Sequence, residues 1–172
     1  MQSIVTRKSQ CALLALQVFL CACSHGGLRS NATATVQIPA DWRRANVDRV
    51  TIYLPPNAKE TATSEPKPDS KRFETERLSI SIARSKADST ALELVSNGES
   101  KKNEEAVLID GRSSLVTKFR IQFPSGRDYV AVAIIPDVYA SEPRNIIMWA
   151  QGQGPEEQEL ARKIFFTARV SP

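Results

Sequence analysis

The chain has 172 residues, of which 41% are hydrophobic and 24% are charged, and this composition is typical of a globular protein. Length and composition predict a single domain and exclude wholesale disorder, a collagen-like repeat and a polytopic membrane protein. The net charge of +4 falls to +2 if Arg7 and Lys8 belong to a removable leader, and so small an excess is not typical of nucleic-acid-binding proteins.

The first 22 residues have the pattern of a secretory signal. Arg7 and Lys8 precede an apolar run at 11–22, and this run ends at the small residue Ala22. A membrane-spanning helix needs about 20 apolar residues, so the run is too short to serve as an anchor. Residues 1–22 are therefore predicted to be a signal peptide that directs the chain to export.

The end of this run, Leu20-Cys21-Ala22-Cys23, resembles the lipobox of bacterial lipoproteins. The resemblance implies that Cys23 becomes the N-terminus of the processed chain and carries a diacylglycerol thioether with further acylation such as palmitate, a permanent membrane anchor. Ser24 in place of an aspartate implies sorting to the outer membrane, with the domain facing the periplasm. The alternative is ordinary cleavage nearby, which would leave a soluble periplasmic protein.

All three cysteines lie in the leader or at its end, at positions 11, 21 and 23. No internal disulfide is possible in the rest of the chain, so its fold must depend on a hydrophobic core. Residues 23–35 are small and polar, which predicts a flexible lipidated tether. Residues 36–172 are predicted to form one folded domain.

The first half of this domain is predicted to contain two strands, a long loop and a short helix. Residues 48–54 alternate apolar and polar side chains and predict a strand that ends at a proline pair. Residues 57–77 are polar and predict a long exposed loop. The period of two at 78–82 predicts a strand, and apolar residues at helical spacing in 87–95 predict a short helix.

The second half predicts a meander and a final helix. Residues 106–109 and 114–123 flank the tight turn Asp110-Gly111, which is typical of a hairpin. Residues 129–135 are apolar on both faces and predict a central strand, and 146–150 predict the last strand. Pro155 with following acids predicts a helix start, and the apolar spacing beyond it predicts an amphipathic helix.

Together these elements predict an α+β fold, an antiparallel sheet covered by two helices. The runs 107–112, 146–149 and 155–164 resemble the PsbP-like fold of photosystem II extrinsic proteins and of bacterial DcrB-type lipoproteins. The resemblance implies a PsbP-like α/β sandwich that mostly binds partners and shares no catalytic residues, so it brings no catalytic position to this chain.

The sequence contains few residue patterns that are typical of catalysis or metal binding. The single histidine, His25, lies in the tether, which argues against a Ser-His-Asp triad and a multi-histidine metal site in the domain. Ser64 and Lys67 have the spacing of an acylating pair, but Pro66 opposes the helix that such a pair needs. The chain is therefore predicted to be no enzyme and to hold no cofactor and no metal.

A basic cluster is the predicted binding surface. Its residues could dock an acidic protein surface or lipid headgroups, with the aromatic ring as an anchor, although a merely solvated run is the alternative. The members are Lys67, Lys71, Arg72, Arg77 and the aromatic Phe73.

The predicted function is that of a non-enzymatic outer-membrane lipoprotein that faces the periplasm and binds a protein partner of the cell envelope. The first alternative is an immunity protein that neutralises a toxin delivered into the periplasm by a secretion system. An envelope hydrolase is the least favoured alternative.

Overall fold

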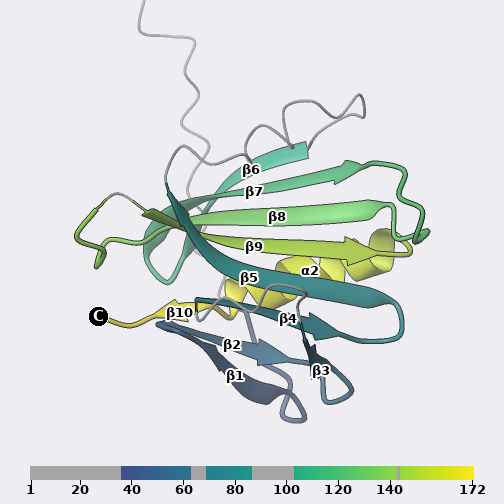
Figure 1. Cartoon of the computed structure of the whole chain (residues 1–172), viewed down its shortest axis with the longest axis horizontal. Helices are drawn as coiled ribbons and strands as arrows, with labels where there is room; N and C mark the ends of the chain where they lie inside the picture. Colours follow the sequence, from purple (N-terminus) through teal and green to yellow (C-terminus); the bar gives the residue numbers. More distant parts are fainter. Residues whose placement is uncertain (1–35, 63–68, 87–102, 143) are drawn as a thin grey trace, which may run out of the picture. The chain divides into compact units, whose positions relative to one another are not determined.

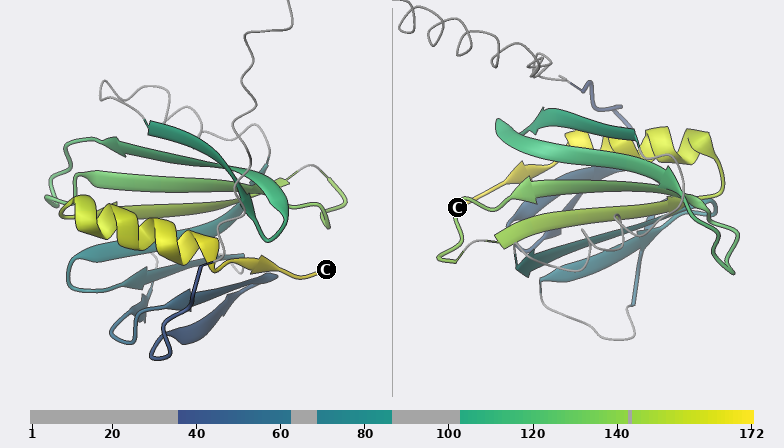
Figure 2. Two further views of the ribbon diagram at one scale, coloured as in Figure 1. Left: turned by 180° about the vertical axis from the view of Figure 1, so that it is seen from behind. Right: turned by 90° about the horizontal axis from the view of Figure 1, so that it is seen from above.

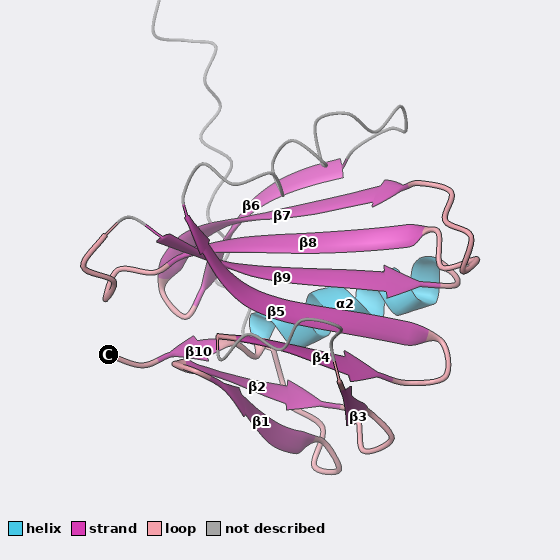
Figure 3. Cartoon of the chain, in the orientation of Figure 1, coloured by secondary structure: helices cyan, strands magenta, loops and turns pink. Residues whose placement is uncertain are grey.

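The structure, a computed structural model, describes residues 36–62, 69–86, 103–142 and 144–172, all within one unit spanning Ala32–Pro172. In these ranges ten strands and one helix are present (Figure 3). The predicted signal peptide, the tether with Cys23, the basic residue Lys67 and the predicted helix at 87–95 lie outside the described residues.

A seven-stranded antiparallel sheet forms the larger part of the fold (Figure 1). Its strand order is β3-β4-β5-β9-β8-β7-β6, so β9, the last of these strands along the chain, lies in the middle of the sheet. The strands are β3 (Lys59–Thr61), β4 (Ser70–Glu74), β5 (Leu78–Lys86), β6 (Asn103–Ile109), β7 (Arg112–Arg120), β8 (Tyr129–Pro136) and β9 (Arg144–Gly152).

A second antiparallel sheet has three strands in the order β1-β2-β10. They are β1 (Arg43–Val47), β2 (Val50–Leu54) and β10 (Arg169–Val170). The tight turn between β1 and β2 holds Asp48 at a φ of 49°, a left-handed conformation that aspartate tolerates better than most residues. This sheet therefore joins the beginning of the described chain to its end.

Helix α2 (Pro155–Phe166) packs on one face of the large sheet, against β5, β8 and β9, and also contacts β2 (Figure 2). Pro155 opens the helix and two glutamates fill its first turn, as the sequence predicts. Ile164 and Phe165 are fully buried in the main core, which also contains residues of both sheets. No helix in the described ranges has the length and hydrophobicity that a membrane span requires.

The large sheet buries side chains on both of its faces. The main core lies on the α2 side, and a smaller cluster of Phe119, Val130 and Val132 forms separately, with Trp149 packed against it. Ring centroids of Phe119 and Trp149 are 5.9 Å apart in an edge-to-face contact. Residues 130–133 are buried without interruption, and this confirms the predicted central strand.

The predicted fold class is wrong. The described chain consists mostly of antiparallel strands in two sheets with one helix, rather than one sheet covered by helices. Part of the error concerns residues 57–77, which were predicted to be a long exposed loop. In the structure this segment contains β3 and β4, which extend the large sheet. Phe73 is the one large apolar side chain of β4, so the segment shows no apolar alternation. Strand β1 was also not predicted.

The predicted hairpin around Asp110 and Gly111 is confirmed, since β6 and β7 pair directly across this turn. The φ angles of these two residues are 52° and 73°, and such a pair of left-handed residues matches the right-handed twist of the flanking strands. The turn brings Asp110 and Arg112 to the end of the sheet where the β8–β9 loop also lies.

Candidate interaction site

The described members of the predicted basic cluster are engaged by neighbouring acids. On β4, the ammonium of Lys71 lies 3.1 Å from the carboxylate of Glu60. The guanidinium of Arg72 lies 2.7 Å from the carboxylate of Glu74 and also donates to the Ser79 hydroxyl at 3.0 Å. These pairs offset most of the positive charge that the sequence placed here, which weakens the case for an anion-binding surface on β4.

The two other described members of the cluster contact the core and helix α2. Phe73 is 2% exposed and belongs to the main core, so it is not available as a surface anchor. Arg77, in the turn between β4 and β5, has its Nε 3.0 Å from the carboxylate of Glu157 on α2. The predicted cluster is therefore not one continuous basic surface in the described residues.

A different surface stands out at the loop between β8 and β9. Val138 is 64% exposed and Tyr139 is 43% exposed, and they are the large hydrophobic residues that the described part of the chain leaves exposed. Single exposed apolar residues are common, but two adjacent ones on a loop tip are a candidate contact surface.

The backbone of this loop is held by local hydrogen bonds. The Tyr139 amide donates to Oδ1 of Asp137 at 3.2 Å, and the Ala140 amide donates to the Asp137 carbonyl at 3.3 Å. The Asp137 amide donates to the Arg144 carbonyl at 3.0 Å, which closes the base of the loop. Asp137 thus forms an Asx-type turn that fixes where Val138 and Tyr139 point.

A buried ion pair ties this turn to the sheets. The Asp137 side chain is fully buried, and its Oδ2 lies 2.9 Å from Nη2 of Arg84 on β5. Nη1 of the same guanidinium lies 2.8 Å from Asp48 in the β1–β2 turn. Burial works to lower the pKa of Arg84, but the hydrogen bond to Asp48 and the charges of Asp137 and Asp48 outweigh it and raise that pKa above its usual value. Arg84 therefore stays charged and links β5 to the β1–β2 turn and to the β8–β9 loop.

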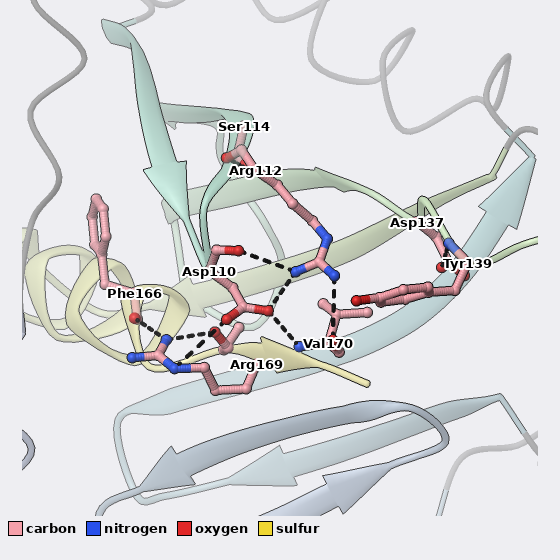
Figure 4. A network of polar contacts seen from close by, with 9 residues as sticks. Asp110, Arg112, Ser114, Asp137, Tyr139, Phe166, Arg169 and Val170 are labelled. Atoms are coloured by element: carbon pink, nitrogen blue, oxygen red, sulfur yellow. Dashed lines mark hydrogen bonds and ion pairs between the residues drawn. The ribbon is translucent and has the colours of Figure 1, made fainter. Parts of the chain in front are cut away.

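A second arginine supports the tyrosine ring directly. The guanidinium of Arg112 lies 5.2 Å from the centroid of the Tyr139 ring (Figure 4). It also pairs with the Asp110 carboxylate and donates to the Val170 carbonyl at 3.2 Å, while the Val170 amide donates to Asp110 at 2.9 Å. This network joins the β6–β7 turn to β10 and fixes the guanidinium beneath the ring.

Of two further arginines, Arg49 contacts the loop itself and Arg169 contacts the Asp110 network. Arg49 donates to the Tyr139 carbonyl at 3.1 Å, and Arg169 lies 3.8 Å from Asp110 with about half of its side chain exposed. The result is an exposed apolar pair flanked by guanidinium groups. Tyrosine and arginine are the residue types that concentrate binding energy in protein interfaces.

The site contains no arrangement that would hold a metal, since no group of three or more His, Cys, Asp or Glu residues in the described ranges has suitable geometry. The sequence signal for the site was weak. Val138 and Tyr139 interrupt an otherwise polar segment that was correctly predicted as a loop between strands, but alternation or spacing could not indicate that these two side chains stay exposed.

Comparison with known proteins gives no family. No family model and no curated protein matches the chain. Among solved structures, a protein from Bacteroides thetaiotaomicron matches with a TM-score of 0.49 and 12% identity over 78% of this chain, which spans only 50% of that protein. The Saccharomyces cerevisiae Ran-binding protein Mog1p matches with a TM-score of 0.48 and 11% identity, over 75% of this chain and 95% of Mog1p. Neither likeness assigns a family or an activity.

Proposed function

We propose that this chain is a lipid-anchored protein of the bacterial outer membrane that faces the periplasm and binds a protein partner without catalysing a reaction. The observation that supports partner binding is the exposed pair Val138 and Tyr139 on a loop that a buried ion pair holds in place. An exposed apolar pair weakens solubility, and contact with a partner would bury it.

The rigidity of the loop favours binding. A flexible loop pays conformational entropy when it docks, whereas a loop already fixed by Asp137 and Arg84 pays little of that cost. The guanidinium of Arg49, which lies at the Tyr139 carbonyl, indicates the chemistry of the partner. We expect an apolar pocket on the partner that receives Tyr139, with a carboxylate near Arg49.

The anchor rests on the leader. Each buried methylene of an acyl chain contributes about 0.8 kcal/mol, so several chains on Cys23 would hold the protein permanently. In the full chain expressed in its own host, Cys23→Ser should move the protein from the membrane fraction to the soluble periplasmic fraction. Equal membrane recovery of this variant, or native material in which mass spectrometry finds the Cys23 thiol unmodified, would contradict the anchor.

The partner can be tested by site-specific cross-linking of the full chain in cells. A photoreactive residue at Val138 should give one discrete adduct, and Arg112→Ser in the same chain should abolish it. The matched control is a photoreactive residue at Gln122, which is exposed in the β7–β8 connection. Equal adducts at both positions, or an adduct that survives Arg112→Ser, would contradict binding by the Tyr139 loop. The mass of the adduct separates an envelope protein from a toxin.

A further inference from the structure

A pocket of about 200 Å³ lies between the β4–β5 turn and the start of α2. It is at the opposite end of β9 from the Tyr139 loop, since that loop precedes β9 and α2 follows it. Its walls combine aliphatic and polar side chains. They include Asn57, Thr75, Glu76, Arg77, Glu157 and Leu160.

Glu157 is the unusual member of this set. Its side chain is 8% exposed, and its Oε1 lies 3.0 Å from Nε of Arg77. Its second oxygen, Oε2, is buried and accepts no hydrogen bond from the described residues. A buried carboxylate oxygen without a hydrogen-bond donor is costly, so a ligand group that donates to Oε2 would gain free energy there.

The backbone around Glu157 leaves room for this arrangement. A Cβ added to Gly152, the last residue of β9, would lie 2.3 Å from the Cβ of Glu157, far inside contact distance. At Gly154 an added Cβ would lie 3.1 Å from Oε2. Glycine at position 152 is therefore required for the first turn of α2 to pack this closely against the end of β9.

The charges at the pocket select the sign of its ligand. A helix start alone favours an anion. Here Glu157 and Glu76 line the pocket and Glu156 occupies the same helical turn, while Arg77 is the lining cation. The excess of carboxylates favours a cationic ligand, and the apolar side chains of Leu78 and Leu160 favour one with an aliphatic stem.

We propose that this pocket binds an alkylammonium group, the side chain of a lysine presented by a partner chain. The butyl stem packs along Leu160, and the ammonium donates a hydrogen bond to Oε2 of Glu157. Arg77 is about half exposed, so it can yield space at the carboxylate without disturbing the core.

The test uses small probes and the full chain in detergent micelles, so it does not depend on the partner of the Tyr139 loop. N-acetyl-lysine-N-methylamide should shift the backbone amide resonances of residues 152–160 in a saturable NMR titration at millimolar concentration. N-acetyl-norleucine-N-methylamide has a similar stem without the charge and should shift them far less. Equal titration by both compounds, or no shift with either, would overturn the proposal.

Three variants locate the contact. Glu157→Gln keeps the shape of the side chain and should weaken lysine-probe binding about tenfold, as expected from loss of a charged hydrogen bond. Glu156→Gln, exposed in the same turn, is the control and should change binding less than about twofold. Arg77→Ser should tighten binding by removing a competing cation.

Weaker binding by Arg77→Ser, or equal losses with Glu156→Gln and Glu157→Gln, would overturn the contact with Glu157. If Glu157→Gln does not fold, the comparison of lysine and norleucine probes on the unaltered chain still decides the proposal.

Discussion

A buried carboxylate lies near each end of β9, and the two carboxylates differ in their ion-pair partners. Before the strand, Asp137 is fully buried and faces the charged guanidinium of Arg84, which Asp48 also engages. After the strand, Glu157 is nearly as buried, but the side chain of its partner Arg77 is 54% exposed, whereas that of Arg84 is 16% exposed. The first carboxylate fixes a loop whose exposed residues can bind. The second leaves a polar requirement that a ligand can meet.

The comparison shows that similar burial of an acid can serve two purposes. A carboxylate with a strong partner acts through the structure it stabilises, and replacing its partner should cost stability. A carboxylate whose partner is largely exposed should contribute less to stability and more to ligand binding. The following changes separate these two roles, beginning with the largest effect.

Arg84→Met should destabilise the domain by about 3 to 5 kcal/mol, because it leaves Asp137 buried without a counter-charge. Chemical denaturation of the full chain measures this loss. The double variant Arg84→Met with Asp137→Leu should recover much of the stability, since neither charge then remains buried. The matched control is Arg120→Met, on an arginine that is 64% exposed, and it should cost less than about 1 kcal/mol. A double variant no more stable than the single one would show that the ion pair is not the cause.

Gly152→Ala should cost about 1 to 3 kcal/mol, because the new Cβ would overlap the Cβ of Glu157 and force the backbone at the start of α2 away from β9. The same change should weaken the lysine probe at the pocket, which links the packing of β9 to the proposed binding. Gln153→Ala, at the exposed neighbour, should change stability by less than about 0.5 kcal/mol. Unchanged stability and probe binding in Gly152→Ala would mean that Glu157 does not depend on the glycine.

Tyr139→Ser should have the smallest effect on stability, less than about 1 kcal/mol, because the ring is exposed and loses mainly its contact with Arg112. It should nevertheless abolish the cross-linked adduct formed from position 138. Thermal unfolding and cross-linking of the same preparation separate the two outcomes. A strong loss of stability would make Tyr139 a structural residue instead of a binding residue.

Sequence patterns predicted the elements that a few neighbouring residues define. The turn at Asp110 and Gly111, the uniformly apolar β8 and the proline start of α2 are all confirmed. Strand β4 was missed because Phe73 is its one buried apolar residue, and the residues around it, which also pair in the sheet, are polar. It pairs with its sequence neighbours β3 and β5, but a strand with one apolar residue lacks the alternation by which a sequence reports it.

The candidate site shows the same division. The strands at 129–135 and 146–150 predicted the connection that contains Tyr139, but the predicted binding surface was the cluster with Lys71, Arg72 and Phe73. Positive side chains close together in sequence suggested a basic surface, but in the structure acids from β3, from β4 itself and from α2 pair with the described ones. The pairs with β3 and α2 depend on which elements meet in the fold, and composition does not report them.

The sequence by itself determined local features of the described chain: the tight turn at Asp110, the central strand and the amphipathic helix, because each depends on residues close together in sequence. The export leader and its lipid anchor remain predictions from the sequence. Only the tertiary structure decided that a polar segment joins the large sheet, that Tyr139 stays exposed over Arg112, and that Glu157 is buried beside Gly152. These outcomes depend on which strands and side chains meet in the fold. Packing and charge in three dimensions determine the free energy of those contacts.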